Sequence, residues 1–191
     1  GYLAHFKNLK HLRIELNGPN ILNQIAAAKL LLLETLHIDC SPMGTDPLVL
    51  NPISDNGTLP IIRLQLSNAL INEKSFDSIN SAMPKLKNFL LIHCMLGSIN
   101  IMDQDSPTIA TKIFGPTLYN PTSFAQYLDT LYISTMCLID IQALLNLPNL
   151  RSLGIGGFRK HFFPDTQSYT NITLESPRLE YFQLDSLLEP A

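Results

Sequence analysis

Histidine and acidic side chains near the start of the sequence are the first residues that could take part in chemistry. His11 lies close to Glu15, and His37 lies close to Asp39. If the two segments are neighbouring strands, these four groups could form a metal site or an acid–base pair. Solvated surface side chains are far more common in such an arrangement, so we predict no metal site.

Cysteine and glycine give two further candidate sites, and both are weak. His93 and Cys94 are adjacent, but adjacent strand residues face opposite ways, which excludes a catalytic dyad. Gly154-Ile155-Gly156-Gly157 lacks the spacing and following helix of a dinucleotide-binding loop. No Gly-x-Ser-x-Gly, phosphate-binding loop or His-Glu-x-x-His sequence occurs. We therefore predict a protein that is not an enzyme and uses no cofactor.

The elements that must position these residues repeat along the chain. A six-residue frame, Leu-x-x-Leu-x-Leu with Ile or Phe at some places, occurs seven times. The copies cover residues 9–14, 33–38, 61–66, 86–91, 128–133, 150–155 and 179–184. Most copies are separated by the length of one strand and one return segment, and parallel strands need a crossover of a dozen or more residues. We therefore predict a single domain, residues 1–191, with about seven parallel strands.

The return segments are expected to be uneven. The clearest helix is predicted over residues 21–30, where Ile21, Ile25 and Ala28 share a face. Shorter helical turns are predicted near 75–83, 123–127 and 140–145, and an extended loop over 41–60. The longest interval is expected to hold an insertion at 103–122, and a degenerate repeat within 92–127 is the alternative.

Two of the frames fit the nine-residue leucine-rich-repeat consensus, which ends in Asn or Cys: Leu9-x-x-Leu12-x-Ile14-x-x-Asn17 and Leu86-x-x-Phe89-x-Leu91-x-x-Cys94. Over about residues 6–187 the chain resembles the leucine-rich-repeat superfamily, and most of all the ribonuclease-inhibitor-like arrays of F-box proteins. The resemblance implies an α/β solenoid, a curved right-handed horseshoe with strands on the concave face. It also implies that the ninth side chain turns inward to bond backbone groups of the next turn.

The residues between the apolar places of each frame are expected to lie on the concave face. Seven strands at ~4.8 Å spacing make a surface of roughly 30 Å, long enough for a peptide or the edge of a domain. The predicted partner-binding residues are His11, Arg13, His37, Asp39, Arg63, Gln65, Asn88, Leu90, Ile92, Tyr132, Tyr181 and Gln183.

This predicted surface is polar over the first three strands and apolar in the middle. Leu90, Ile92 and Tyr132 form the apolar centre, and Gly154 and Gly156 are expected to leave a shallow patch beside it. An apolar centre with a polar rim is typical of a protein interface. The alternative is that the insertion folds over Leu90 and Ile92 and buries them.

Composition excludes several classes of partner. The 191 residues are 46% apolar and 15% charged, with a net charge of −3. Without clustered Lys and Arg we expect no nucleic acid. The longest apolar run, residues 25–33, is shorter than the ~20 residues that cross a bilayer, so we expect no membrane. The three widely spaced cysteines indicate neither a disulfide framework nor a zinc site.

Two functional hypotheses follow. The first is a non-catalytic module that binds a protein or peptide on its concave face. By resemblance it is the substrate-recognition part of an F-box-type ubiquitin-ligase receptor in the cytoplasm or nucleus. The second is a secreted or extracellular repeat protein, a receptor ectodomain or microbial effector. The glycosylation triplets at Asn56 and Asn171 favour it, whereas the lack of a cysteine pair at either end disfavours it.

Overall fold

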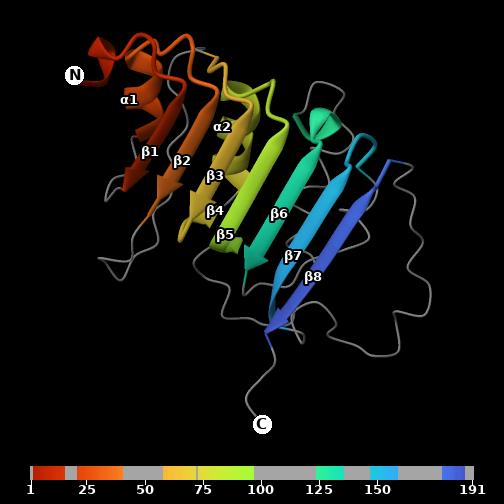
Figure 1. The fold of residues 1–191 in the computed structure, drawn as a ribbon. Helices are drawn as coiled ribbons and strands as arrows, with labels where there is room; N and C mark the ends of the chain where they lie inside the picture. The colour runs from red at the N-terminus through yellow and green to blue at the C-terminus, as the bar shows by residue number, and fades with distance from the viewer. Residues whose placement is uncertain are drawn as a thin grey trace.

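Seven parallel strands stand side by side in the order of the sequence (Figure 1). The structure is a computed structural model that describes residues 2–15, 21–40, 58–71, 73–96, 124–135, 147–158 and 178–187. The seven strands are β1 (His11–Glu15), β2 (Thr35–Asp39), β3 (Arg63–Ser67), β5 (Asn88–Leu96), β6 (Thr130–Thr135), β7 (Ser152–Phe158) and β8 (Tyr181–Leu187). This solenoid-like arrangement confirms the predicted stack of parallel strands.

The register of the sheet follows the repeated frame. The fourth place of each frame pairs with the fourth place of the next, from Leu12 with Leu36 at one end to Leu153 with Phe182 at the other. The strands between them keep the same alignment over the frame. Since every frame has the same pattern and strand side chains alternate between faces, equal places fall on the same face throughout.

The apolar places of the frames form the core. In the second to sixth frames all three apolar side chains have 0% exposure. The helices α1 (Ile21–Ala27) and α2 (Glu73–Ala82) both lie behind the sheet, on the side of this core (Figure 1). Ile25 of α1 and Ile79 of α2 are part of this core. The opposite side of the sheet carries no helix among the described residues.

The two end frames are less buried than the prediction required. Leu9, Leu12 and Ile14 of the first frame are half-buried. In the last frame Phe182 occupies a core place but is 47% exposed. The physical reason is that β1 and β8 each lack a neighbour on one side within the described part of the sheet.

The helical elements match the prediction in place but not in length. α1 ends three residues before the predicted end, and Lys29 follows it with a φ of 51°, a left-handed conformation that is common after a helix. α2 begins at Glu73, before the predicted start at Ser75. A short 3₁₀ helix, η2 (Phe124–Tyr127), confirms the predicted turn there.

Two short elements have no counterpart in the prediction. They are a 3₁₀ helix, η1 (Tyr2–His5), and a strand, β4 (Leu70–Ile71), which pairs with the end of β5. The predictions for residues 41–57, 103–122 and 140–145 lie outside the described residues.

Candidate functional site: the open face of the sheet

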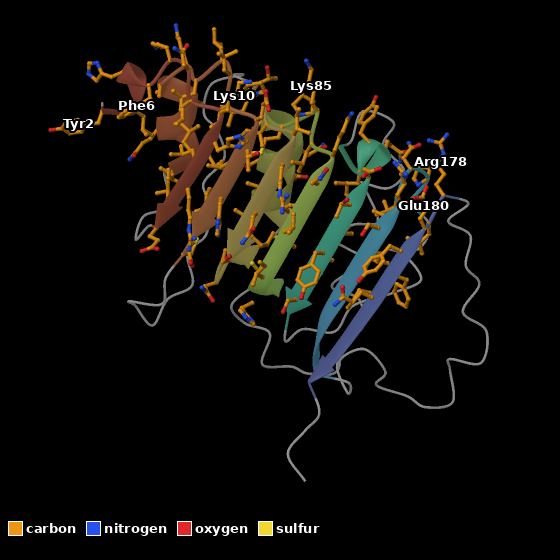
Figure 2. All side chains as sticks on the ribbon, viewed as in Figure 1. Tyr2, Phe6, Lys10, Lys85, Arg178 and Glu180 are labelled. Carbon is orange, nitrogen blue, oxygen red and sulfur yellow. The ribbon has the colours of Figure 1, made fainter. Side chains whose placement is uncertain are left out.

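The face of the sheet that points away from α1 and α2 is the candidate site, and we call it the open face (Figure 2). It carries the third, fifth and seventh places of the frames, and all twelve predicted partner-binding residues lie on it. The register arranges them in three rows. The first row is His11, Thr35, Arg63, Asn88, Thr130, Ser152 and Tyr181; the middle row is Arg13, His37, Gln65, Leu90, Tyr132, Gly154 and Gln183; the third row is Glu15, Asp39, Ser67, Ile92, Ser134, Gly156 and Asp185.

The polar half of the open face, on β1 to β3, is tied together by hydrogen bonds centred on His37. The side-chain amide of Gln65 donates to Nε2 of His37 across 3.1 Å, and the Ser67 hydroxyl oxygen lies 3.4 Å from the same nitrogen. Burial lowers the pKa of His37, and the nearby Arg13 guanidinium lowers it further. The lowered pKa and these contacts together favour a neutral imidazole. Its unprotonated Nε2 can accept a hydrogen bond.

His11 and His37 lie on neighbouring strands, as expected, but in different rows of the open face. His11 lies in the first row opposite Thr35, whereas His37 lies in the middle row opposite Arg13. Among the described residues, no group of three or more His, Cys, Asp or Glu side chains could hold a metal ion. The contacts of His37 are therefore with polar side chains of the next strand.

Asn68 completes this half of the face and was missed by the sequence analysis. Its side-chain amide donates to Oδ1 of Asp39 across 2.9 Å, and its backbone N–H donates to the carbonyl of Ile92. Its φ of 57° is left-handed, a conformation that asparagine tolerates better than most residues. An asparagine two places after the end of the third frame was the available signal.

The apolar half of the open face is centred on β5 and β6, with the glycines of β7 beside them. Leu90 pairs with Tyr132 across β5 and β6, and Ile92 follows one place further along the same face. All three side chains are half-buried. They are neither fully exposed nor sealed, so an apolar surface remains accessible between polar neighbours.

The space over the glycines of β7 is occupied, whereas the prediction expected a shallow patch there. A Cβ built on Gly154 would overlap Cδ2 of the Tyr132 ring, and one built on Gly156 would lie 3.2 Å from the Tyr132 hydroxyl oxygen. The ring therefore lies across both glycines. The expected hollow is occupied by the aromatic side chain of the preceding strand.

At the end of the frame in β5, His93 and Cys94 confirm the expected opposite orientation. His93 is exposed with a φ of 52°, and the register shifts between Ile92 and Cys94. Cys94 is buried and its thiol donates to the Leu66 carbonyl across 3.3 Å, so the ninth side chain turns inward, here toward the preceding strand. Burial raises its pKa to about 11, which disfavours the nucleophilic thiolate.

Comparison with known proteins adds no identification. Neither family models, nor curated proteins, nor solved structures gave a match to this chain. Within the described part of the chain, no helix has the length and apolar character needed to cross a membrane.

Proposed function

We propose that this chain is a non-catalytic recognition module whose open face binds a protein or peptide. The observation that carries the proposal is the half-buried apolar group of Leu90, Ile92 and Tyr132 in the middle of an otherwise polar face. Apolar centres with polar rims are typical of protein interfaces, and tyrosine is enriched among the residues that contribute most to binding.

The placement of Tyr132 supports its role as an anchor. Its ring rests on the backbone of Gly154 and Gly156, which restricts its movement before a partner arrives. A side chain that is already ordered loses less conformational entropy on binding. The neighbouring Leu90 and Ile92 extend the apolar contact by one strand.

The repeated frame and the inward Cys94 support the finer assignment to leucine-rich-repeat horseshoes, with the open face as the concave face. On that resemblance we place the module in the substrate-recognition part of an F-box-type ubiquitin-ligase receptor, in the cytoplasm or nucleus. Cys40 and Cys94 are buried free thiols, which is in keeping with a reducing compartment.

The test is Ile92→Asp, which places a charge in the apolar centre. Proteins captured from a lysate by the unmodified chain are identified and purified, and their affinity for each variant is then measured. We expect Ile92→Asp to weaken binding at least about tenfold while the free energy of unfolding changes by ~1 kcal/mol or less. Gln24→Asp makes an equal charge change at an exposed side chain of α1, away from the open face, and is the matched control that should leave binding unchanged.

Two outcomes count against the proposal. If Ile92→Asp binds every partner as well as the unmodified chain does, the open face is not the interface. If it unfolds the protein, Ile92 is part of a covered core and not of an accessible surface.

A further inference from the structure

The segments that lead into strands β2, β3, β5 and β6 form one edge of the sheet, which we call the N-terminal edge. It comprises residues 29–34, 58–62, 84–87 and 124–129. Backbone hydrogen bonds of 2.9 Å join these segments in order. The N–H of Ile62 donates to the carbonyl of Glu34, and the N–H of Lys87 donates to the carbonyl of Ile62. In the same way the N–H of Asp129 donates to the carbonyl of Lys87, so the four segments lie side by side.

Large apolar side chains are exposed along this edge. Leu31, Leu32, Ile62 and Tyr127 are between 40% and 76% exposed, with Leu31 the most exposed. They precede β2, β3 and β6, and each of these strands has a neighbouring strand on both sides. Their exposure therefore does not arise from the ends of the described sheet. Apolar side chains gathered in this way mark an interaction surface.

The same edge carries three exposed lysines, Lys29, Lys85 and Lys87. Within the described part of the chain, none of the three forms an ion pair. Figure 2 shows Lys85 at this edge, with Lys10 further along it. Three positive charges without an acidic partner thus lie among the exposed apolar side chains.

The two acidic side chains of the edge each lie beside a basic one. Glu34 is 3.9 Å from Lys10, and Asp129 is 3.9 Å from Arg151. The opposite charge prevails toward the C-terminal ends of the strands, where the third row of the open face contains no Lys or Arg but holds Glu15, Asp39 and Asp185. Although the chain has a net charge of −3, excess positive charge and exposed apolar groups coincide at the N-terminal edge.

We propose that the N-terminal edge binds the surface of a bilayer that contains anionic phospholipids. Leu31, Leu32 and Ile62 enter the boundary between headgroups and acyl chains, and the lysines contact the lipid phosphates. The long lysine side chains can reach the headgroups while their stems lie along apolar surface. A fluid bilayer accepts protruding side chains from several turns without a matching surface, whereas a folded acidic partner would have to supply one.

This contact is peripheral and needs no segment that crosses the bilayer. The sequence-based expectation of no membrane rested on the lack of such a segment, and it does not bear on binding at the surface. The N-terminal edge lies outside the apolar centre of the open face, so the inference does not depend on the proposed function.

Sedimentation with vesicles tests the proposal on the full chain. One set of vesicles contains equal parts of phosphatidylcholine and phosphatidylserine, and the other contains phosphatidylcholine alone. We expect the chain to sediment with the first set and to partition at least about tenfold more weakly into the second, because the lysines need anionic headgroups.

A pair of variants separates the position of the charge from its amount. The double variant Lys85→Gln, Lys87→Gln should weaken partitioning into the phosphatidylserine vesicles at least about tenfold. Arg13→Glu changes the net charge by the same amount but lies on the open face, so it is the matched control and should weaken partitioning far less. Equal partitioning of the unmodified chain and the double lysine variant would overturn the proposal.

Insertion of the apolar side chains can be followed by fluorescence, because the chain contains no Trp. Leu31→Trp introduces a single reporter, whose emission should shift to the blue with phosphatidylserine vesicles as the indole leaves water. Arg13→Trp on the open face is the control and should show no shift. If Leu31→Trp shows no shift and soluble polyglutamate binds the chain as tightly as the vesicles do, the edge recognises an acidic polypeptide and the proposal fails.

The double variant Leu31→Ser, Leu32→Ser tests whether these side chains are free to reach a bilayer. It should weaken partitioning at least about tenfold and leave the urea midpoint unchanged, since both side chains are exposed. A large fall in the urea midpoint would show that the chain itself covers the two leucines, which would also overturn the proposal.

Discussion

The two halves of the open face are built by different forces. On β2 and β3, directional hydrogen bonds between polar side chains join His37 to Gln65, and join Asp39 to Asn68 directly after β3. On β6 and β7, the ring of Tyr132 is held by shape, because two glycines leave room for it. The first arrangement depends on protonation and on donor geometry, whereas the second depends on the volume that the glycines leave for the ring.

From this difference we can predict how substitutions in each half change the stability of the protein. A single intramolecular hydrogen bond contributes about 0.5–1.5 kcal/mol net, so the polar half loses stability in small steps. A close packed contact tolerates added volume poorly, and overpacking costs about 1–3 kcal/mol. The apolar half should therefore be the more sensitive to one added methyl group.

The largest effect is expected for Gly154→Ala. Its Cβ would overlap Cδ2 of Tyr132, so the ring must leave its place over β7. We expect the free energy of unfolding to fall by about 1–3 kcal/mol, measured by urea denaturation.

A double-mutant cycle isolates the cause. In a Tyr132→Ala background the ring is absent, and Gly154→Ala should then cost much less. Gly156→Ala is a graded control, since its Cβ would lie 3.2 Å from the Tyr132 hydroxyl oxygen and should cost less than Gly154→Ala. An equal cost for Gly154→Ala in both backgrounds would show that the ring does not set the constraint.

In the polar half, Asn68→Ala tests backbone conformation and hydrogen bonding together. Alanine tolerates a φ of 57° less well than asparagine does and also loses the bond to Asp39, so we expect a total cost of about 1–2 kcal/mol. Asn68→Gly keeps the left-handed backbone and loses the bond to Asp39 alone, so its cost should be smaller. Equal unfolding free energies for the two variants would contradict a role for the backbone conformation.

The strands and their register could be predicted because the information is local and repeated. Each frame places apolar side chains at fixed intervals, and the two-residue period of a strand then assigns every other side chain to a face. Leu64, Phe89 and Leu131 consequently pair and are buried as the frame requires. The same periodicity placed the twelve predicted residues on one face.

The contacts across strands could not be predicted in this way. The Asn68 bond to Asp39 joins residues 29 positions apart and depends on a left-handed backbone. The position of the Tyr132 ring depends on which way its side chain turns toward Gly154. Phe182 belongs to a frame like the others, but its exposure is set by the absence of a strand beside β8 in the described sheet.

The smallest effect concerns the pH dependence of the polar half. The pKa of His37 is lowered in the folded chain, chiefly by burial and then by Arg13, while Asp39 and Glu15 oppose the shift. As the pH falls, the unfolded chain therefore binds a proton at this residue before the folded chain does. The contribution is fully present above the ordinary value of 6.5 and is lost as the pH falls below it.

His37→Gln removes this titration and keeps a polar side chain at the site. When the pH is lowered from about 7.5 to about 5.5, the range over which histidine changes charge, the urea midpoint of the unmodified chain should fall more than that of His37→Gln. The difference between the two isolates His37 from the exposed His5, His11 and His93. A larger fall of the urea midpoint in His37→Gln would mean that the folded protein favours the charged imidazole. That result would contradict a neutral ring that accepts a hydrogen bond from Gln65.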